Sequence, residues 1–136
     1  MFTQFPIHGR DANRKSHDIL GYVVNPEFSG IDTDGFRNPQ QTQPVEWVAI
    51  GDSFTYGYGV SSEESWPAQL ADRLNRPVYN YGVGGYGIVH YRWLFDLAFE
   101  KKPQAIVLAL FLPNDLEDAC KMARNAHSDS EFEKRG

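Results

Sequence analysis

The sequence Trp47-Val48-Ala49-Ile50-Gly51-Asp52-Ser53-Phe54 joins a run of apolar residues to a glycine turn and a serine. A short apolar run that ends at glycine is typical of a buried β-strand. The turn then presents Ser53 at the carboxyl end of the predicted strand. Open α/β sheets bind their ligands at this end of their strands, so Ser53 is a candidate functional residue.

Two later segments repeat this design. The strand-like Val78-Tyr79-Asn80 runs into a glycine-rich turn, and residues 106–111 run into Pro113-Asn114-Asp115. Because the carboxyl ends of parallel strands meet at one edge of a sheet, we expect the three turns to converge. Three strand exits therefore carry a serine, glycines and an asparagine.

Two amphipathic helical patterns separate these strands. The first is expected to begin at the Ser61-x-x-Glu64 capping box, and the second to end before Pro103. Their apolar faces are formed by Trp66, Leu70, Leu74, Ile88, Tyr91, Leu94, Phe95 and Ala98. The order β-α-β-α-β predicts a three-layer α/β/α fold of flavodoxin-like type with a central parallel sheet.

The placement of the strands can also be predicted. Residues 105–111 are apolar throughout, which predicts a central strand covered by helices on both faces. Right-handed crossovers place the strand that begins near Trp47 between its two successors or beside them.

The chain divides into three parts by composition. Residues 1–44 are expected to form an irregular N-terminal extension, with one strand-like run at 19–24. Residues 45–118 are the predicted α/β domain, and 119–136 a polar C-terminal tail. Within the extension, residues 34–38 predict a turn that docks Phe36 on the domain and pairs Arg37 with a carboxylate. A length of 136 residues is short for a doubly wound enzyme, so we expect a C-terminal truncation.

Composition argues against several classes of function. A net charge of −5, with both signs interspersed, disfavours nucleic-acid binding. The longest apolar run, 105–112, is too short to span a membrane. Residues 1–6 lack the features of a signal peptide, so a cytoplasmic location is the default expectation. The single Cys120 has no partner for an intramolecular disulfide and no neighbours for a zinc site.

Each strand exit supports a chemical role and a plainer alternative. Ser53 at a strand–helix junction would face backbone N–H groups, as a nucleophile requires, or would only cap the helix. Gly85 lacks a side chain, so its N–H can approach a substrate oxygen closely, although such a turn can be purely conformational. Asn114 offers a side-chain N–H₂ to the same oxygen, or forms an Asx turn.

In combination, these motifs resemble a known family. Gly51-Asp52-Ser53, Asn80-x-Gly82-Val83-Gly84-Gly85 and Asn114-Asp115 are similar to blocks I, II and III of the SGNH (GDSL) hydrolases. Residues 34–38 resemble an element that often precedes block I, so the resemblance covers about residues 19–118. It implies hydrolysis of a small-molecule ester without metal or organic cofactor. It also implies that Ser53 is the nucleophile, with the Ser53 N–H, the Gly85 N–H and the Asn114 side chain as the oxyanion hole.

The sequence departs from this family in two places. Pro113 replaces the usual glycine of block III, which removes an N–H and stiffens the turn. More seriously, the fifth block, Asp-x-x-His, which supplies the general base, has no match: Arg124 stands three residues before His127. The other histidines, expected to be structural or solvated, are His8, His17 and His90. Serine alone is a weak nucleophile, so a non-catalytic or truncated SGNH-like ligand-binding domain is the alternative.

Other functions receive less support. The pattern Gly82-x-Gly84-x-x-Gly87 matches a dinucleotide fingerprint but lacks the acidic residue expected after the next strand. Gly51-x-Ser53-x-Thr55 lacks the second glycine of an α/β-hydrolase elbow. SGNH relatives cleave acyl esters, sugar acetates, lysophospholipids or thioesters, or transfer the acyl group, and the sequence leaves this choice open. The tyrosines expected around the site, either stacking on substrate or packing in the core, are Tyr56, Tyr58, Tyr81 and Tyr86.

Overall fold

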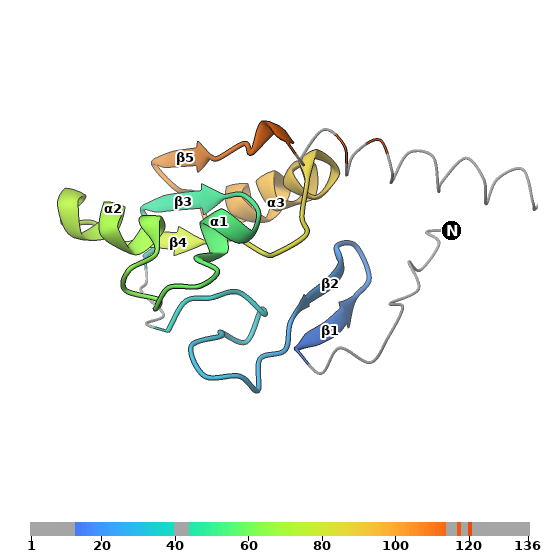
Figure 1. Ribbon diagram of the computed structural model, residues 1–136. Helices are drawn as coiled ribbons and strands as arrows, with labels where there is room; N and C mark the ends of the chain where they lie inside the picture. Colours follow the sequence, from blue (N-terminus) through green and yellow to red (C-terminus); the bar gives the residue numbers. More distant parts are fainter. Residues whose placement is uncertain (1–12, 40–43, 114–116, 118–119, 121–136) are drawn as a thin grey trace, which may run out of the picture.

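The computed structural model describes residues 13–39, 44–113, 117 and 120 of the chain. In this part, a β-hairpin lies beside a parallel sheet with helices around it (Figure 1). The elements are β1 (Arg14–His17), β2 (Gly21–Val24), β3 (Trp47–Ile50), α1 (Ser53–Tyr56), α2 (Trp66–Leu74), β4 (Val78–Asn80), α3 (Ile88–Glu100) and β5 (Ala105–Leu108). The predictions for Asn114 and for the tail at 119–136, residue 120 excepted, lie outside the described residues.

The sheet has the strand order β4-β3-β5, and all its pairings are parallel. Trp47 of β3 pairs with Val78 on one side and with Ala105 on the other. The predicted α/β class with a parallel sheet is confirmed, and β3 takes the position between its two successors. Right-handed crossovers in this order place α2 and α3 on opposite faces, where α2 contacts β4 and α3 contacts β3.

The prediction for the last strand was wrong in part. β5 spans only Ala105–Leu108 and lies at an edge of the sheet among the described residues, not at its centre. Its residues are half-buried or exposed, whereas Val48, Ala49 and Ile50 of β3 have no exposed surface. An apolar run thus identified a strand, but its position depends on which neighbours pair with it.

The start of α2 also differs from the prediction. The helix begins at Trp66 with Ser65 as its N-cap, and a proline at residue 67 suits this first turn. The expected capping pair forms ahead of the helix, where the Glu64 side chain accepts a hydrogen bond from the Ser61 N–H at 3.0 Å. This bond lowers the pKa of the Glu64 carboxyl. The pair therefore stabilises a turn and does not start the helix.

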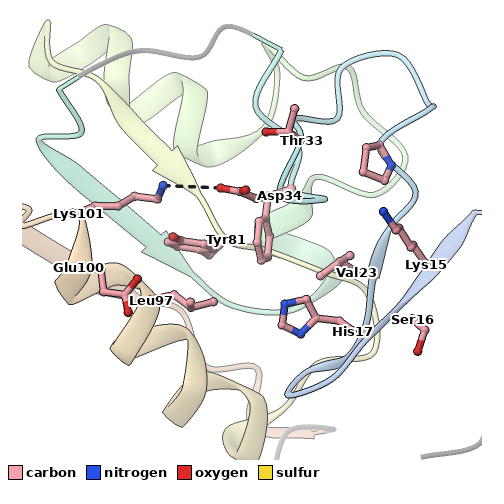
Figure 2. A pocket seen from close by; sticks show the side chains of 12 residues that line it. Lys15, Ser16, His17, Val23, Thr33, Asp34, Tyr81, Leu97, Glu100 and Lys101 are labelled. Atoms are coloured by element: carbon pink, nitrogen blue, oxygen red, sulfur yellow. Dashed lines mark ion pairs between the residues drawn. The ribbon is translucent and has the colours of Figure 1, made fainter.

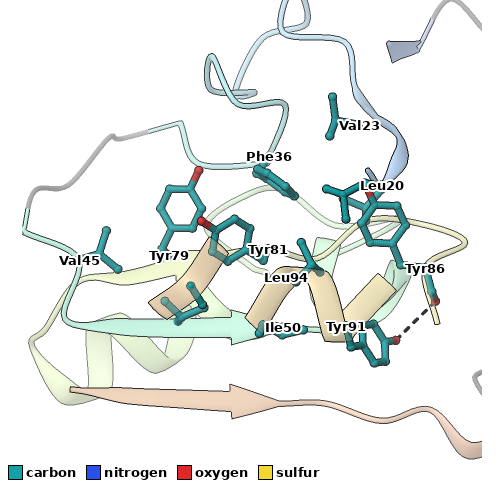
Figure 3. Packing of buried hydrophobic residues seen from close by; sticks show 13 residues of the cluster. Leu20, Val23, Phe36, Val45, Ile50, Tyr79, Tyr81, Tyr86, Tyr91 and Leu94 are labelled. Atoms are coloured by element: carbon teal, nitrogen blue, oxygen red, sulfur yellow. Dashed lines mark hydrogen bonds between the residues drawn. The ribbon is translucent and has the colours of Figure 1, made fainter. Parts of the chain in front are cut away.

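The N-terminal segment is more regular than expected. Its strands β1 and β2 form an antiparallel hairpin in which Arg14 pairs with Val24. Leu20, Val23 and Phe36 from this segment are buried in the same cluster as the sheet residues (Figure 3). The hairpin and the sheet therefore share one hydrophobic core.

The turn at residues 34–38 confirms one prediction and corrects another. Phe36 is buried, with its ring 4.6 Å from that of Tyr81, so its docking role is confirmed. Arg37 does not pair with a carboxylate of the described residues as predicted; its guanidinium donates to the backbone carbonyls of Tyr56, Gly57 and Val60. These carbonyls lie at the end of α1 and in the turn that follows it, so several oxygens face one cation.

The longest described helix, α3, has 13 residues, and none of the described helices combines the length and apolar character that a bilayer crossing demands.

Candidate active site

Ser53 lies where the sequence predicts it, just beyond the end of the central strand. β3 ends at Ile50, and Ser53 is the first residue of the single-turn helix α1. Asp52 caps this helix, because its carboxylate accepts a hydrogen bond from the Phe54 N–H at 2.9 Å. The alternative that Ser53 serves as the cap is therefore wrong. Ser53 is half-buried, and its hydroxyl makes no hydrogen bond to another described residue.

The turn after β4 packs directly against α1. A methyl group on Gly82 would lie 2.2 Å from the backbone nitrogen of Tyr56, so only glycine permits this approach. A methyl group on Gly84 would lie 3.7 Å from Cβ of Ser53. The Val83 N–H also donates to the Gly51 carbonyl at 3.4 Å. The first two strand exits are therefore neighbours in space.

The buried side chain of Asn80 forms hydrogen bonds with both of these strand exits. The Asn80 side chain donates to the Thr55 carbonyl at 2.9 Å and accepts from the Gly82 N–H at 2.8 Å. Asn38 extends the network, since its side-chain oxygen accepts from the Asn80 N–H at 2.8 Å. Asp32 in turn accepts from the Asn38 side chain at 3.0 Å. Buried polar groups require such partners, so the network fixes both turns.

Neither Asn80 nor Asn38 is a predicted site residue, although both lie within the motifs quoted from the sequence. Asn80 could have been recognised from the sequence, because it is a polar residue at the end of a buried strand and must find hydrogen-bond partners there. Asn38 offered no comparable signal, because its partner lies 42 residues away in the chain.

Gly85 occupies a conformation that favours glycine, with φ of +85°. On the side of the hairpin, the Tyr22 hydroxyl donates to the carbonyl of Gly84 at 2.8 Å. The Tyr86 hydroxyl in turn donates to the Tyr22 carbonyl. Burial raises the pKa of the Tyr86 phenol, so that it remains protonated and able to donate. The turn after β4 is therefore held by α1 on one side and by β2 on the other.

The third strand exit runs beside the first as far as the structure describes it. The Ala109 N–H donates to the Ile50 carbonyl at 2.9 Å, and the ring centroids of Phe54 and Phe111 lie 4.6 Å apart. Asn114 lies outside the described residues, so its place in the oxyanion hole stays a prediction.

The two described histidines have structural contacts. Nδ1 of His17 accepts hydrogen bonds from the N–H groups of Ile19 and Leu20 in the hairpin turn. His90 stacks on the Tyr86 ring at 4.3 Å, and its Nδ1 accepts from the Gly87 N–H at the start of α3. His8 and His127 lie outside the described residues.

Two cavities flank the hairpin. The one of about 460 Å³ is bordered by Gly84, the neighbour of Ser53, and by Tyr22, Val83, Tyr56, Tyr58 and Arg14. The other, of about 570 Å³, lies between the hairpin and the end of α3, where Asp34 and Lys101 pair at 3.8 Å (Figure 2). Gly84 does not line this larger cavity, and Ser53 lines neither of the two. The smaller cavity is therefore the one that adjoins the candidate site.

Of the four tyrosines expected around the site, two are buried and two line the smaller cavity. Tyr81 and Tyr86 belong to the hydrophobic core. Tyr56 is half-buried and Tyr58 is exposed at the cavity. Tyr81 also borders the larger cavity, so of these four tyrosines only Tyr56 and Tyr58 line the cavity that adjoins the candidate site.

The described fold is thus a parallel α/β sheet with a serine at the exit of its central strand, beside a glycine turn from the next strand. Residues 49–129 match the GDSL-like lipase/acylhydrolase family. The chain belongs to this family, whose members are the SGNH hydrolases.

Two solved structures resemble the chain. One is a protein from Desulfitobacterium hafniense DCB-2 assigned to the G-D-S-L lipolytic family, with 28% identity, a TM-score of 0.46, and coverage of 62% of this chain and 54% of that one. The other is AlinE4, an SGNH-hydrolase family esterase, with 26% identity, a TM-score of 0.47, and coverage of 71% and 57%. The chain thus spans little more than half the length of each. Comparison with curated proteins finds no match.

Proposed function

We propose that the chain carries the nucleophile and the first oxyanion-hole donors of a serine ester hydrolase. The observation that supports this most directly is the position of Ser53, beside the Gly84–Gly85 turn and without the capping role that Asp52 performs. A hydroxyl at a strand exit that has no structural partner among the described residues is available for chemistry.

In this proposal, Oγ of Ser53 attacks the carbonyl carbon of an ester, and its proton passes to a general base. The negative charge that develops on the carbonyl oxygen is stabilised by the N–H groups of Ser53 and Gly85 and by the Asn114 side chain. Collapse of the tetrahedral intermediate expels the alcohol, which takes the proton from the base. Water then hydrolyses the acyl-serine in a second cycle of the same kind.

The general base is the part of the mechanism that the described residues do not provide. His17 and His90 are engaged in the hairpin turn and at the start of α3. A serine without a base retains only the stabilisation supplied by the oxyanion hole and substrate binding, roughly 10³ to 10⁴ over the uncatalysed reaction. The rate of ester hydrolysis by this chain therefore indicates whether a general base is present: a rate enhancement well above this range requires one.

The cavity of about 460 Å³ is the proposed binding site for the substrate. Its tyrosine rings, from Tyr22, Tyr56 and Tyr58, suit an acyl chain or a sugar ring. The same cavity supports the alternative function, a non-catalytic domain that binds such a ligand without cleaving it.

The experiment is to treat the chain with a fluorophosphonate probe and, separately, with a short-chain p-nitrophenyl ester. Ser53→Ala is the test variant, and Ser61→Ala, which changes an exposed serine, is the matched control. We expect Ser53→Ala to abolish labelling and, if a base is present, to lower ester turnover by about 10⁶-fold, since the nucleophile is lost. Ser61→Ala should behave as the unaltered chain.

Three outcomes are distinguishable. Labelling and turnover that depend on Ser53 support the hydrolase. A folded chain with neither activity, but with calorimetric binding of a short-chain ester that Tyr58→Ala weakens, supports the ligand-binding alternative. Turnover that survives Ser53→Ala contradicts the proposed role of this residue.

A further inference from the structure

We propose that Tyr22, in the N-terminal hairpin, is a positioning residue for the oxyanion hole. This inference rests on the proposed function, because it concerns the Gly85 N–H that serves there as a donor. The contact that carries it is the hydrogen bond of 2.8 Å from the Tyr22 hydroxyl to the Gly84 carbonyl.

The Gly84 carbonyl and the Gly85 N–H are two ends of one planar peptide unit. In a trans peptide, these two groups point in opposite directions. A partner that holds the carbonyl therefore also sets the direction of the N–H. Tyr22 holds the carbonyl on the side of the hairpin, so the N–H is directed away from the hairpin.

The turn is intrinsically flexible, so a hydrogen bond is needed to fix the orientation of the Gly84–Gly85 peptide. Both residues of this peptide unit are glycines, and Gly85 has φ of +85°. Glycine has the largest range of backbone conformations, so a Gly-Gly peptide can rotate unless a contact fixes it. A methyl group on Gly85 would lie 2.7 Å from the Tyr22 hydroxyl, which shows how closely the phenol approaches the turn.

Tyr22 is well placed for this task because it is itself fixed. The Tyr86 hydroxyl donates to its backbone carbonyl, and the two rings meet edge to face at 5.4 Å. Arg14 lies on the neighbouring strand β1, and its guanidinium is 4.1 Å from the centroid of the Tyr22 ring. The phenol thus reaches the turn from a strand whose own position is set by the core.

The hydrogen bond also changes the strength of the donor. An amide whose carbonyl accepts a hydrogen bond is polarised, which makes its N–H a better donor. Tyr22 therefore acts on the oxyanion in two ways, by aiming the Gly85 N–H and by strengthening it. Neither effect requires Tyr22 to touch the substrate carbonyl.

The test is Tyr22→Phe, which removes the hydroxyl and keeps the ring. The matched control is Tyr91→Phe, because the Tyr91 hydroxyl makes a longer contact of 3.5 Å with the carbonyl of Tyr86, two residues beyond Gly84. With the p-nitrophenyl ester, we expect Tyr22→Phe to lower kcat about tenfold and to leave KM within about twofold. Loss of a whole oxyanion donor costs ~10² to 10³, so misalignment of one donor should cost less. Tyr91→Phe should leave both constants unchanged.

A second measurement does not depend on turnover. The backbone order parameter of the Gly85 amide, from ¹⁵N relaxation, should be near the rigid value of about 0.85 in the unaltered chain and fall below about 0.6 in Tyr22→Phe. Tyr91→Phe should keep the rigid value. A Gly85 amide that is already mobile in the unaltered chain, or equally rigid in Tyr22→Phe, would overturn the inference.

The two proposals fail in different ways. If Ser53→Ala leaves labelling and turnover intact, the proposed function fails, whatever the Gly85 amide does. If turnover depends on Ser53 but Tyr22→Phe changes neither kcat nor the order parameter, only the role of Tyr22 fails. Equal losses in Tyr22→Phe and Tyr91→Phe would indicate general loosening of the turn and would also overturn it.

Discussion

The turn after β4 and the segment after β5 leave the same edge of the sheet, yet they are held in different ways. The turn after β4 is fixed by buried hydrogen bonds from Asn80 and by the Tyr22 hydroxyl. The described segment after β5 has contacts with β3 and Phe54, but its apolar side chains remain largely exposed, and Leu112 is 66% exposed.

This difference shows how the candidate site is built. Hydrogen bonds from the hairpin, β4 and the segment 32–38 hold the Gly84–Gly85 turn beside Ser53. The segment after β5 contacts Ile50 and Phe54 on either side of Ser53, whereas these hydrogen bonds that hold the turn come from other parts of the chain. The stability of the fold should accordingly be sensitive to changes around the turn after β4 and insensitive to changes at the exposed residues after β5.

The largest effect is expected for Gly82→Ala. The new methyl group would meet the backbone of Tyr56 at 2.2 Å, and a backbone cannot move aside as a flexible side chain can. We expect the free energy of unfolding to fall by at least about 3 kcal/mol, the upper range for an overpacked core. Urea unfolding followed by circular dichroism measures it. A loss below about 1 kcal/mol would mean that the two strand exits are not tightly packed.

The next effect is expected for Asn80→Ala. This change removes both side-chain bonds of Asn80 and leaves the Thr55 carbonyl and the Gly82 N–H buried without these partners. The free energy of unfolding should fall by about 2 kcal/mol. Asn75→Gly, at the exposed end of α2, is the control for the loss of a carboxamide, because glycine accepts the positive φ of 48° that Asn75 has. Equal losses in the two variants would contradict a special role for the buried network.

A smaller effect is expected from alkaline pH. Burial raises the pKa of Tyr79, Tyr81 and Tyr86 above the ordinary value of 10.0, and all three lie on β4 or the turn that follows it. Above about pH 10 the unfolded chain releases these protons while the folded chain keeps them, so stability is complete below that pH and falls as pH rises.

Each buried tyrosine should contribute up to about 1.4 kcal/mol per pH unit to this loss. Urea midpoints recorded between about pH 9 and about pH 11 measure the slope. Tyr79→Phe should reduce this slope by the contribution of one tyrosine, up to about 1.4 kcal/mol per pH unit. A slope that is unchanged in Tyr79→Phe would show that Tyr79 ionises as easily in the folded chain as in the unfolded one.

The smallest effect is expected for Leu112→Ser, at the exposed segment after β5. Because Leu112 is mostly in contact with solvent, its replacement should change the free energy of unfolding by less than about 0.5 kcal/mol. The measurement is the same urea titration. A loss of 2 kcal/mol or more would remove the contrast between the two strand exits.

Much of the fold followed from local patterns. The apolar runs at 47–50 and 78–80 and the spacing of apolar residues in α3 predicted these elements, because their periodicity reflects the face that each one buries. The position of β5 did not follow, since an apolar strand can lie at the edge or at the centre of a sheet. The start of α2 was also missed, because the Ser61–Glu64 pair can stabilise a turn as well as a helix.

For the site, the sequence determined membership in the GDSL-like family and the candidate residues, a serine after the central strand and a glycine turn after the next. Only the tertiary structure decided what holds them in place. Tyr22 lies 62 residues from Gly84 in the chain, and Asn38 lies 42 from Asn80. Contacts over such separations leave no periodic trace in a sequence, because they depend on how the hairpin and the sheet share one core.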